Sequence, residues 1–498
     1  MKKTMKFVAL FVAVSILALS LPKFGTLNPS EKLTSGNEVS STFALHAPVE
    51  WISESFKDAL FAASEKNNVR DRDFQPIKIS DRTTYANLAR IEFIQIWFEE
   101  DEEVSEINLR DMEKLPNIRS FSIDHGIDNV KISDLSPLAK LTNLEHLDIP
   151  YTKVSDLSPL AGLTKLEYLS LHLCEDVSDL SPLAKLTNLQ DLNISYTKVS
   201  DFSPLAKLIN LTDIDAEGIK ISDLSPISGL TNLRHLNISN TEISDLSPLT
   251  KLINLSSLSF FNCVKISDFS PLAKMINLTD LDASGVKISD LSPISELTNL
   301  RHLDISNTGV SDLSQLSRLV NLEWLYIDSC EEVYDLSPLA ELTNLNNLTF
   351  SDTKISDLSP IAGLTNLNYL NLDSCAEISD LSPLAGLTNL RHLNLDSCTG
   401  ISDLSPLSRL VNLEWLHIDY CEGVSDLSPL SGLTNLERLY ISYTKASDLS
   451  PLAGLTNLLE VDAGYTEVTD WSPVAHVPGV NKDKEYYDDA GECACGWE

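Results

Sequence analysis

Aspartate is the residue whose type and spacing first suggest chemistry in this chain. It recurs within an S-D-L-S-P-L element, and its sixteen copies lie 22 or 23 residues apart. Paired carboxylates can serve acid–base catalysis or bind calcium. A repeated column provides no unique site, so we expect these carboxylates to accept hydrogen bonds from backbone amides in a turn. The column consists of Asp134, Asp156, Asp179, Asp201, Asp223, Asp245, Asp268, Asp290, Asp312, Asp335, Asp357, Asp380, Asp403, Asp426, Asp448 and Asp470.

Cysteine forms a second column with its own spacing rule. Six of the eight cysteines fall in the six 23-residue intervals, one in each, and none falls in the nine 22-residue intervals. Cys375, Cys398 and Cys421 lie in three successive intervals, which would suit a redox or metal ladder. The short intervals carry Thr or an apolar residue at this place, as at Thr353 and Ile219. We therefore favour a structural thiol that faces the interior, where a small donor satisfies loop carbonyls.

The other reactive residues form no catalytic or metal-binding motif. The nine histidines lie singly along the chain, and only His392 and His417 would approach each other on neighbouring strands. The pair Cys493 and Cys495 is able to oxidise or bind metal, but no His or Cys cluster accompanies it. The sequence has no G-x-S-x-G, H-E-x-x-H or P-loop motif. We expect no enzyme activity, no cofactor and no bound metal.

A repeat of 22 or 23 residues must position both columns. Each copy holds a pattern such as Leu144-x-x-Leu147-x-Ile149, which predicts a strand that points its Leu and Ile inward. Ser136-Pro137 predicts an N-cap followed by Pro at the first position of a short helical turn. One repeat cannot bury its own apolar face, so neighbours must stack. The pattern predicts an α/β repeat solenoid: a curved leucine-rich repeat array with a parallel concave sheet and short helical turns on its convex side.

The first 45 residues differ in composition from the repeats. Residues 1–20 include three lysines near their start, Lys2, Lys3 and Lys6, and the apolar run at 7–21 is shorter than the about 20 residues that a membrane span needs. This pattern predicts a secretory signal peptide, with an uncleaved anchor as the alternative. The Ser/Thr-rich residues 21–45 predict a flexible linker.

The ends of the array require caps that cover its core. An amphipathic helix at 51–66, with Ser53 as its N-cap, and two degenerate repeats predict a helical N-terminal cap at 46–131. About fifteen repeats then occupy 132–474. The pattern stops at Val474, and residues 475–498 are expected to form a C-terminal cap and an acidic tail.

The charge balance limits the classes of partner. The 498 residues include 37 Lys and Arg against 72 Asp and Glu, a formal net charge of −35. Nucleic acids and anionic lipids are bound by cationic faces, so we expect neither as a partner.

The repeat at 379–390, S-D-L-S-P-L-A-G-L-T-N-L, resembles the internalin-type repeats of Gram-positive surface proteins. The helix near Ser53 and the ending at 469–474 are also similar to that group, so the resemblance covers roughly residues 46–480. It implies a right-handed curved solenoid that binds a partner through its concave sheet, without catalysis. The usual Asn of the turn is Thr or Cys here, and one internalin's partner cannot be transferred to another.

The outward strand positions change along the array from acidic to aromatic. Large aromatics on a solvent-facing sheet are enriched at binding hot spots. Duplicated repeats, with aromatics that only pack on one another, are the alternative. The expected ligand-binding residues of the concave face are Trp324, Tyr326, Tyr369, His392, Trp415, His417, Tyr420, Arg438, Tyr440 and Tyr443.

Together these features predict a non-enzymatic exported recognition module that binds a protein or a cell-surface glycan and acts in adhesion. The expected location is outside a bacterial cell, secreted or at its surface, with no stable membrane span after signal cleavage. A structural cell-envelope repeat protein is the first alternative. An intracellular scaffold or enzyme regulator is the second, if the signal is misread.

Overall fold

The computed structural model describes residues 49, 51, 54–66, 68–80, 83–96, 107, 109–123 and 131–482. The predicted signal peptide, the linker, Ser53, Cys493 and Cys495 lie outside the described residues. All described residues belong to one unit, Pro48–Glu498.

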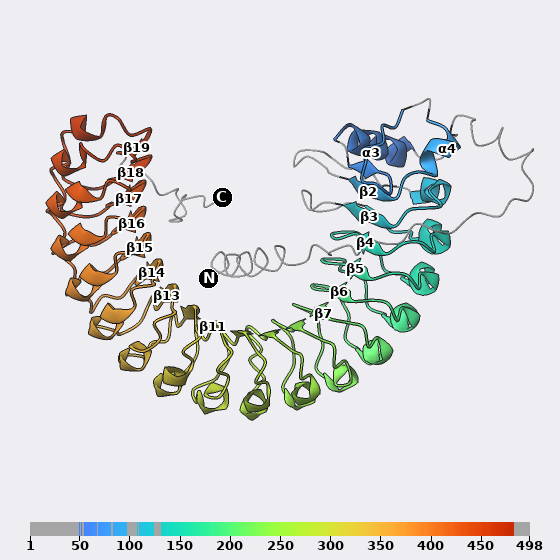
Figure 1. The fold of residues 1–498 in the computed structure, drawn as a ribbon, viewed down its shortest axis with the longest axis horizontal. Helices are drawn as coiled ribbons and strands as arrows, with labels where there is room; N and C mark the ends of the chain where they lie inside the picture. Colours follow the sequence, from blue (N-terminus) through green and yellow to red (C-terminus); the bar gives the residue numbers. More distant parts are fainter. Residues whose placement is uncertain are drawn as a thin grey trace, which may run out of the picture. The chain divides into compact units, whose positions relative to one another are not determined.

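Nineteen short strands in the described residues pair in a single curved sheet, which lines the inner side of the array in Figure 1. They are β1 (Val69–Arg70), β2 (Phe93–Ile96), β3 (Ser120–Ile123), β4 (His146–Asp148), β5 (Tyr168–Ser170), β6 (Asp191–Asn193), β7 (Asp213–Asp215), β8 (His235–Asn237), β9 (Ser257–Ser259), β10 (Asp280–Asp282), β11 (His302–Asp304), β12 (Trp324–Tyr326), β13 (Asn347–Thr349), β14 (Tyr369–Asn371), β15 (His392–Asn394), β16 (Trp415–His417), β17 (Arg438–Tyr440), β18 (Glu460–Asp462) and β19 (Gly479–Asn481).

The pairing confirms the predicted repeat solenoid. Each strand from β2 to β18 pairs in parallel with the next strand of the chain, without a register shift between equivalent repeat positions. Only β1 runs antiparallel, against β2. Equivalent side chains of successive repeats therefore form straight rows across the sheet, one strand apart, or about 4.8 Å.

Short 3₁₀ turns occupy the outer side of the array (Figure 1). They are η1 (Leu109–Lys114), η2 (Ser136–Lys140), η3 (Ser158–Gly162), η4 (Ser181–Lys185), η5 (Ser203–Lys207), η6 (Ser225–Ile227), η7 (Ser247–Lys251), η8 (Ser270–Lys274), η9 (Ser292–Ile294), η10 (Ser314–Arg318), η11 (Ser337–Leu339), η12 (Ser359–Gly363), η13 (Ser382–Gly386), η14 (Ser405–Arg409), η15 (Ser428–Gly432), η16 (Ser450–Leu452) and η17 (Ser472–Val474).

The core runs continuously between the sheet and the turns. Leu144, Leu147 and Ile149 are fully buried, as are their equivalents in the later repeats. Because each Leu contacts the repeats before and after it, truncation of one to Ala in such a core typically costs 2–5 kcal/mol. The repeats therefore stabilise one another as neighbours in a stack.

The turns begin differently from the prediction. Ser136 is the first residue of η2 rather than its N-cap, and Leu135 takes the cap position without a side-chain bond. The cap function belongs to the aspartate column: Asp134 Oδ1 accepts the Ser136 backbone N–H at 2.8 Å. All sixteen aspartates accept the equivalent bond, at 2.7–2.9 Å. This confirms their predicted role in the turn.

The N-terminal helix lies where the amphipathic pattern places it. The helix α3 (Glu54–Glu65) buries Phe56, Leu60 and Ala63, and a second helix, α4 (Tyr85–Leu88), precedes β2. The two degenerate repeats supply β2 and β3, which extend the sheet from β4 to the N-terminal end of the array. No helix in the described ranges is long and apolar enough to cross a membrane.

The sheet continues past Val474, where the sequence pattern stops. The strand β19 pairs with β18, and His476 Nε2 lies 3.0 Å from the carbonyl of Leu455. This last segment no longer has the Leu and Asn residues of the repeat. Its apolar residues still occupy inward positions, which are Val474, Val477 and Val480. One further strand thus covers this end of the core.

Candidate functional site

Three rows of side chains make up the exposed face of the sheet. The first row is the first residue of each strand from β4 to β18, and the second row is the third residue. The turn row is the residue three positions after the strand end. In all fifteen repeats this residue has a positive φ, between 53° and 72°. The middle residue of each strand points into the core, so within each strand only the first and third residues face outward.

The late part of these rows carries a continuous cluster, which we term the aromatic patch. It comprises Tyr369, His392, Trp415 and Arg438 in the first row, His417 and Tyr440 in the second, and Tyr420, Tyr443 and Tyr465 in the turn row. All nine side chains are partly exposed.

First-row contacts link four strands, β14 to β17. The rings of His392 and Trp415 lie 4.6 Å apart, and the guanidinium of Arg438 lies 4.6 Å from the centre of the Trp415 ring. Tyr369 contacts His392 at 6.1 Å. Arg438 also pairs with Glu460, with Nε and Oε2 3.8 Å apart, so its charge has a partner at the surface.

The other two rows form parallel stacks. His417 and Tyr440 stack at 4.3 Å, and Tyr443 stacks at 4.4 Å on both Tyr420 and Tyr465. Each stacking contact covers one face of both rings, so Tyr443 has both faces covered and its exposed part is the ring edge and hydroxyl group. Burial, followed by the hydrogen bond to Glu460, raises the pKa of Tyr440, and its phenol stays protonated at neutral pH.

The turn-row tyrosines adopt a costly backbone conformation. Tyr420, Tyr443 and Tyr465 have φ values of 60°, 57° and 55°. Left-handed geometry costs a residue with a Cβ about 1–2 kcal/mol. Every repeat takes this conformation here, with Gly, Asn, Asp or Ser in most of the others and with Tyr151, Leu173 and Tyr196 early in the array. The conformation therefore belongs to the repeat and does not by itself distinguish the aromatic patch. Tyr465 was not among the expected binding residues, although its register in the sequence matches that of Tyr420 and Tyr443.

The structure places Trp324 and Tyr326 apart from the aromatic patch. They lie on β12, and β13 presents Asn347 and Thr349 between them and Tyr369. Trp324 contacts His302 at 5.0 Å with the two ring planes 60° apart. The ten expected residues thus form two groups: eight in the aromatic patch and two on β12.

The earlier strands carry a carboxylate-rich face, as the sequence indicates. Burial, followed by repulsion from Asp213, raises the pKa of Asp191 to about 7. Burial, and then the neighbouring Asp282, raises the pKa of Asp304 to about 8. The hydrogen bond from His235 to Asp213 raises the pKa of this histidine. Asp191 and Asp304 therefore bind protons more readily than ordinary aspartates do.

No candidate metal or redox centre emerges among the described residues. No cluster of three or more His, Cys, Asp or Glu side chains there could hold a metal ion. His392 lies near Glu414, and His417 near Asp396. The six described cysteines are free and fully buried. The thiol of Cys398 donates to the carbonyl of Leu372 at 3.1 Å, and burial raises its pKa. These contacts agree with the structural interpretation of the column.

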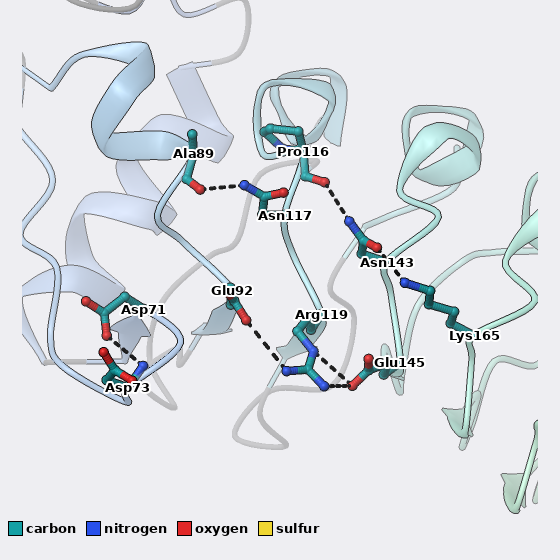
Figure 2. A network of polar contacts seen from close by, with 10 residues as sticks. All are labelled: Asp71, Asp73, Ala89, Glu92, Pro116, Asn117, Arg119, Asn143, Glu145 and Lys165. Carbon is teal, nitrogen blue, oxygen red and sulfur yellow. Dashed lines mark hydrogen bonds and ion pairs between the residues drawn. The ribbon is translucent and has the colours of Figure 1, made fainter. Parts of the chain in front are cut away.

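One row of side chains had no role in the sequence interpretation. The Asn of each T-N-L segment donates Nδ2 to a carbonyl one repeat earlier, as Asn366 does to Thr343 at 2.8 Å. Figure 2 shows the start of this asparagine row, where Asn117 reaches the carbonyl of Ala89 and Asn143 that of Pro116. Its signal in the sequence is an Asn three residues before the start of each strand from β4 to β18, with Lys165 before β5 as the exception.

Comparison with known proteins agrees with this architecture. The family model for leucine-rich repeats (2 copies) matches residues 142–185, 209–251 and 343–386. The search of curated proteins gave no match. Among solved structures, an internalin (inlF) from Listeria monocytogenes is 32% identical over 61% of this chain and 83% of that chain, with a TM-score of 0.48. This chain belongs to the internalin-type leucine-rich repeat proteins.

Two further structures support the fold of this internalin-type protein. A Leptospira interrogans LRR protein superimposes with a TM-score of 0.64 at 20% identity, over 76% of this chain and 97% of that one. The functional domain of InlJ from L. monocytogenes, which includes a cysteine ladder, gives a TM-score of 0.51 at 20% identity, over 82% of this chain and 80% of that one.

Proposed function

We propose that this internalin-type protein is an exported, non-enzymatic recognition module whose aromatic patch binds a protein surface. The continuity of the patch across β14–β18 is the observation that carries this proposal. The leucine-rich repeat fold commonly serves as a protein-binding module, and such proteins are typically not enzymes.

The composition of the patch favours a protein as the partner. Tyr, Trp and Arg dominate the energetics of protein interfaces, and Trp415, Arg438 and Tyr440 lie on two adjacent strands. A sugar ring stacks best on an open aromatic face, whereas stacking covers one or both ring faces in the second row and the turn row of this patch.

Binding by the purified chain to a panel of cell-surface and envelope proteins, measured by surface plasmon resonance, tests this proposal. The double substitution Trp415→Ala/Tyr440→Ala should weaken binding at least about 100-fold, because each truncated hot-spot side chain costs about 2 kcal/mol or more. Tyr334→Ala is the matched control, since Tyr334 is an aromatic residue outside the patch and is 71% exposed.

Equal binding by the double variant and the parent, with unchanged unfolding temperatures, would place the interface elsewhere. Self-association without any ligand would instead favour the structural envelope protein. Glycan binding that depends on Trp415 and Tyr440 would contradict a protein partner for this surface.

Export is a separate part of the proposal, and it rests on the lysine-rich start and the apolar run within residues 1–21. Intact-mass spectrometry of the chain from culture medium or the cell surface should show loss of the signal segment. An intact Met1 in the cytosolic fraction alone would favour the intracellular scaffold.

A further inference from the structure

We propose that this protein has a second binding site, a polar groove beside β12–β16 that takes a neutral, hydroxyl-rich oligosaccharide. The groove has a volume of about 660 Å³ and lies at one edge of the concave sheet. Its lining comprises Glu323, Trp324, Asn344, Asn346, Asn366, Asn368, Asn389, Arg391 and Asn412. The proposal does not depend on the aromatic patch being a protein interface.

The groove lies along what we term the flank row, the residue immediately before each strand. Charged residues of this row pair between strands in several repeats, and Figure 2 shows Arg119 beside Glu92 and Glu145. At β7, β9 and β10 the row carries the short residues Thr212, Ser256 and Thr279. Between the Arg301–Glu323 and Arg391–Glu414 ion pairs it carries two amides, Asn346 and Asn368. These two amides line the groove.

The groove's polar atoms suit hydroxyl groups. Asn366, Asn389 and Asn412 use Nδ2 to hold carbonyls of the preceding repeat, and no described residue donates to their Oδ1 atoms. The Asn368 side chain bonds to no described residue. Amides accept and donate without charge, as recognition of sugar hydroxyls requires. At the other end of the array, by contrast, Lys165 covers Asn143 Oδ1 at 2.8 Å (Figure 2).

The charge of the groove favours a neutral ligand. The two charged residues of the groove are Glu323 and Arg391. Glu323 pairs with Arg301 at 2.8 Å, and Arg391 pairs with Glu414, so each has a counter-charge. An anionic ligand would also approach a chain of net charge −35. Long-range electrostatics therefore disfavours acidic glycans and leaves neutral ones unaffected.

Trp324 provides the apolar contact at one end of the groove. Its contacts with His302 and Tyr326 are inclined by about 60° rather than parallel, so no ring stacks flat on the indole. A sugar's apolar face stacks on an open aromatic surface of this kind. The amides repeat once per strand, or about every 4.8 Å, a spacing comparable with one hexose unit. A linear oligosaccharide along the row can meet equivalent groups at each sugar.

Isothermal titration of the purified full chain with soluble tetrasaccharides tests the site. The panel contains β-1,4-linked glucose, N-acetylglucosamine and mannose tetramers, α-1,4-linked glucose, and an anionic hyaluronan tetrasaccharide. Asn346→Arg/Asn368→Glu should weaken binding of a neutral tetramer at least tenfold, because its longer side chains fill the groove. Trp324→Ala should weaken binding by a similar factor.

Two controls separate this site from the rest of the chain. Ser256→Arg/Thr279→Glu places the same pair in the flank row at β9 and β10 and should leave affinity unchanged, as should Trp415→Ala. The unfolding temperature confirms that each variant is folded. The proposal is overturned if no neutral tetramer binds, if the filled variant binds as well as the parent, or if only the anionic sugar binds. Loss of protein binding in Trp415→Ala/Tyr440→Ala with intact sugar binding would show two independent sites.

Discussion

Thr and Cys satisfy the same need in repeats of two lengths. Thr197 Oγ1 donates to the carbonyl of Ile194 at 2.7 Å within its own repeat. The longer repeats place a thiol here, and Cys398 reaches back to Leu372 of the preceding repeat at 3.1 Å. These contacts confirm the inward-facing donor that the sequence predicts. The stacking of one turn on the next decides whether the acceptor carbonyl lies in the same repeat or in the preceding one.

Cys398 allows this function to be tested with two isosteric substitutions. Cys398→Thr should change the free energy of unfolding by less than about 1 kcal/mol, because a hydroxyl can donate as the thiol does. Cys398→Val should be less stable than Cys398→Thr by about 1 kcal/mol, since it removes the donor at nearly equal volume. Urea unfolding followed by circular dichroism measures both. Equal stabilities would mean that the thiol acts only as an apolar filler.

At the scale of the element, each outer turn combines an aspartate cap with a proline. Asp357 accepts from the Ser359 backbone N–H at 2.8 Å and from its hydroxyl at 2.9 Å. Pro follows the Ser in fifteen of the sixteen copies, and Gln315 in η10 is the exception. Pro fixes φ at a value that the turn already requires and supplies no N–H where none is needed.

Gln315→Pro should therefore stabilise the protein. The Asp312–Ser314 bond keeps the same geometry in η10 as in the Pro-containing turns, and the Gln315 N–H bonds to no described residue. The expected gain is about 0.4–1 kcal/mol, from reduced entropy of the unfolded chain.

Differential scanning calorimetry would measure the gain as a higher unfolding temperature. Pro293→Gln in η9 is the reverse control and should lose a similar amount. A destabilised Gln315→Pro would mean that η10 does not share the backbone conformation of the other turns.

At the scale of the whole molecule, the concave side of the array carries several buried carboxylates with raised pKa values. Burial raises the pKa of Asp215 to about 7, and burial with the neighbouring Asp396 raises that of Asp419 to about 8. Turn aspartates behave oppositely: hydrogen bonds from the backbone and side chain of Ser181 lower the pKa of Asp179. The two groups give opposite pH dependences.

The sign of each effect follows from proton binding. Between about pH 4 and 8 the folded chain holds more protons on the concave carboxylates than the unfolded chain does, so stability falls as pH rises. Below about pH 4 the unfolded chain takes up more protons on the turn aspartates, so stability falls as pH drops. We therefore expect maximal stability at about pH 4–5.

Urea midpoints between pH 3 and 9 test this expectation. Asp304→Asn should reduce the loss of stability toward pH 8, because an amide does not titrate. The substitution should be tolerated, since Asn193 occupies the same row and accepts from the Ser195 backbone N–H at 3.0 Å. Stability that increases from pH 5 to pH 8 would contradict the raised pKa of the concave carboxylates.

The sequence determined the fold because a repeat array is specified by local spacing. Leu147 and Ile149 had to face a core that only neighbouring copies provide, and one period fixed the strands, the turns and the aspartate caps together. For the same reason, register alone indicated which aromatic residues share the concave face.

Tertiary structure alone decided how those residues meet. The stacking of Tyr420, Tyr443 and Tyr465 depends on left-handed backbone geometry that no spacing in the sequence reveals. The groove at Asn346 and Asn368 likewise depends on how side chains of adjacent repeats lie together. The separation of Trp324 from the aromatic patch, by contrast, follows from the register of the repeats. Residues 22 or 23 positions apart become neighbours only after the repeats stack, and then side-chain shape rather than period decides which contacts form.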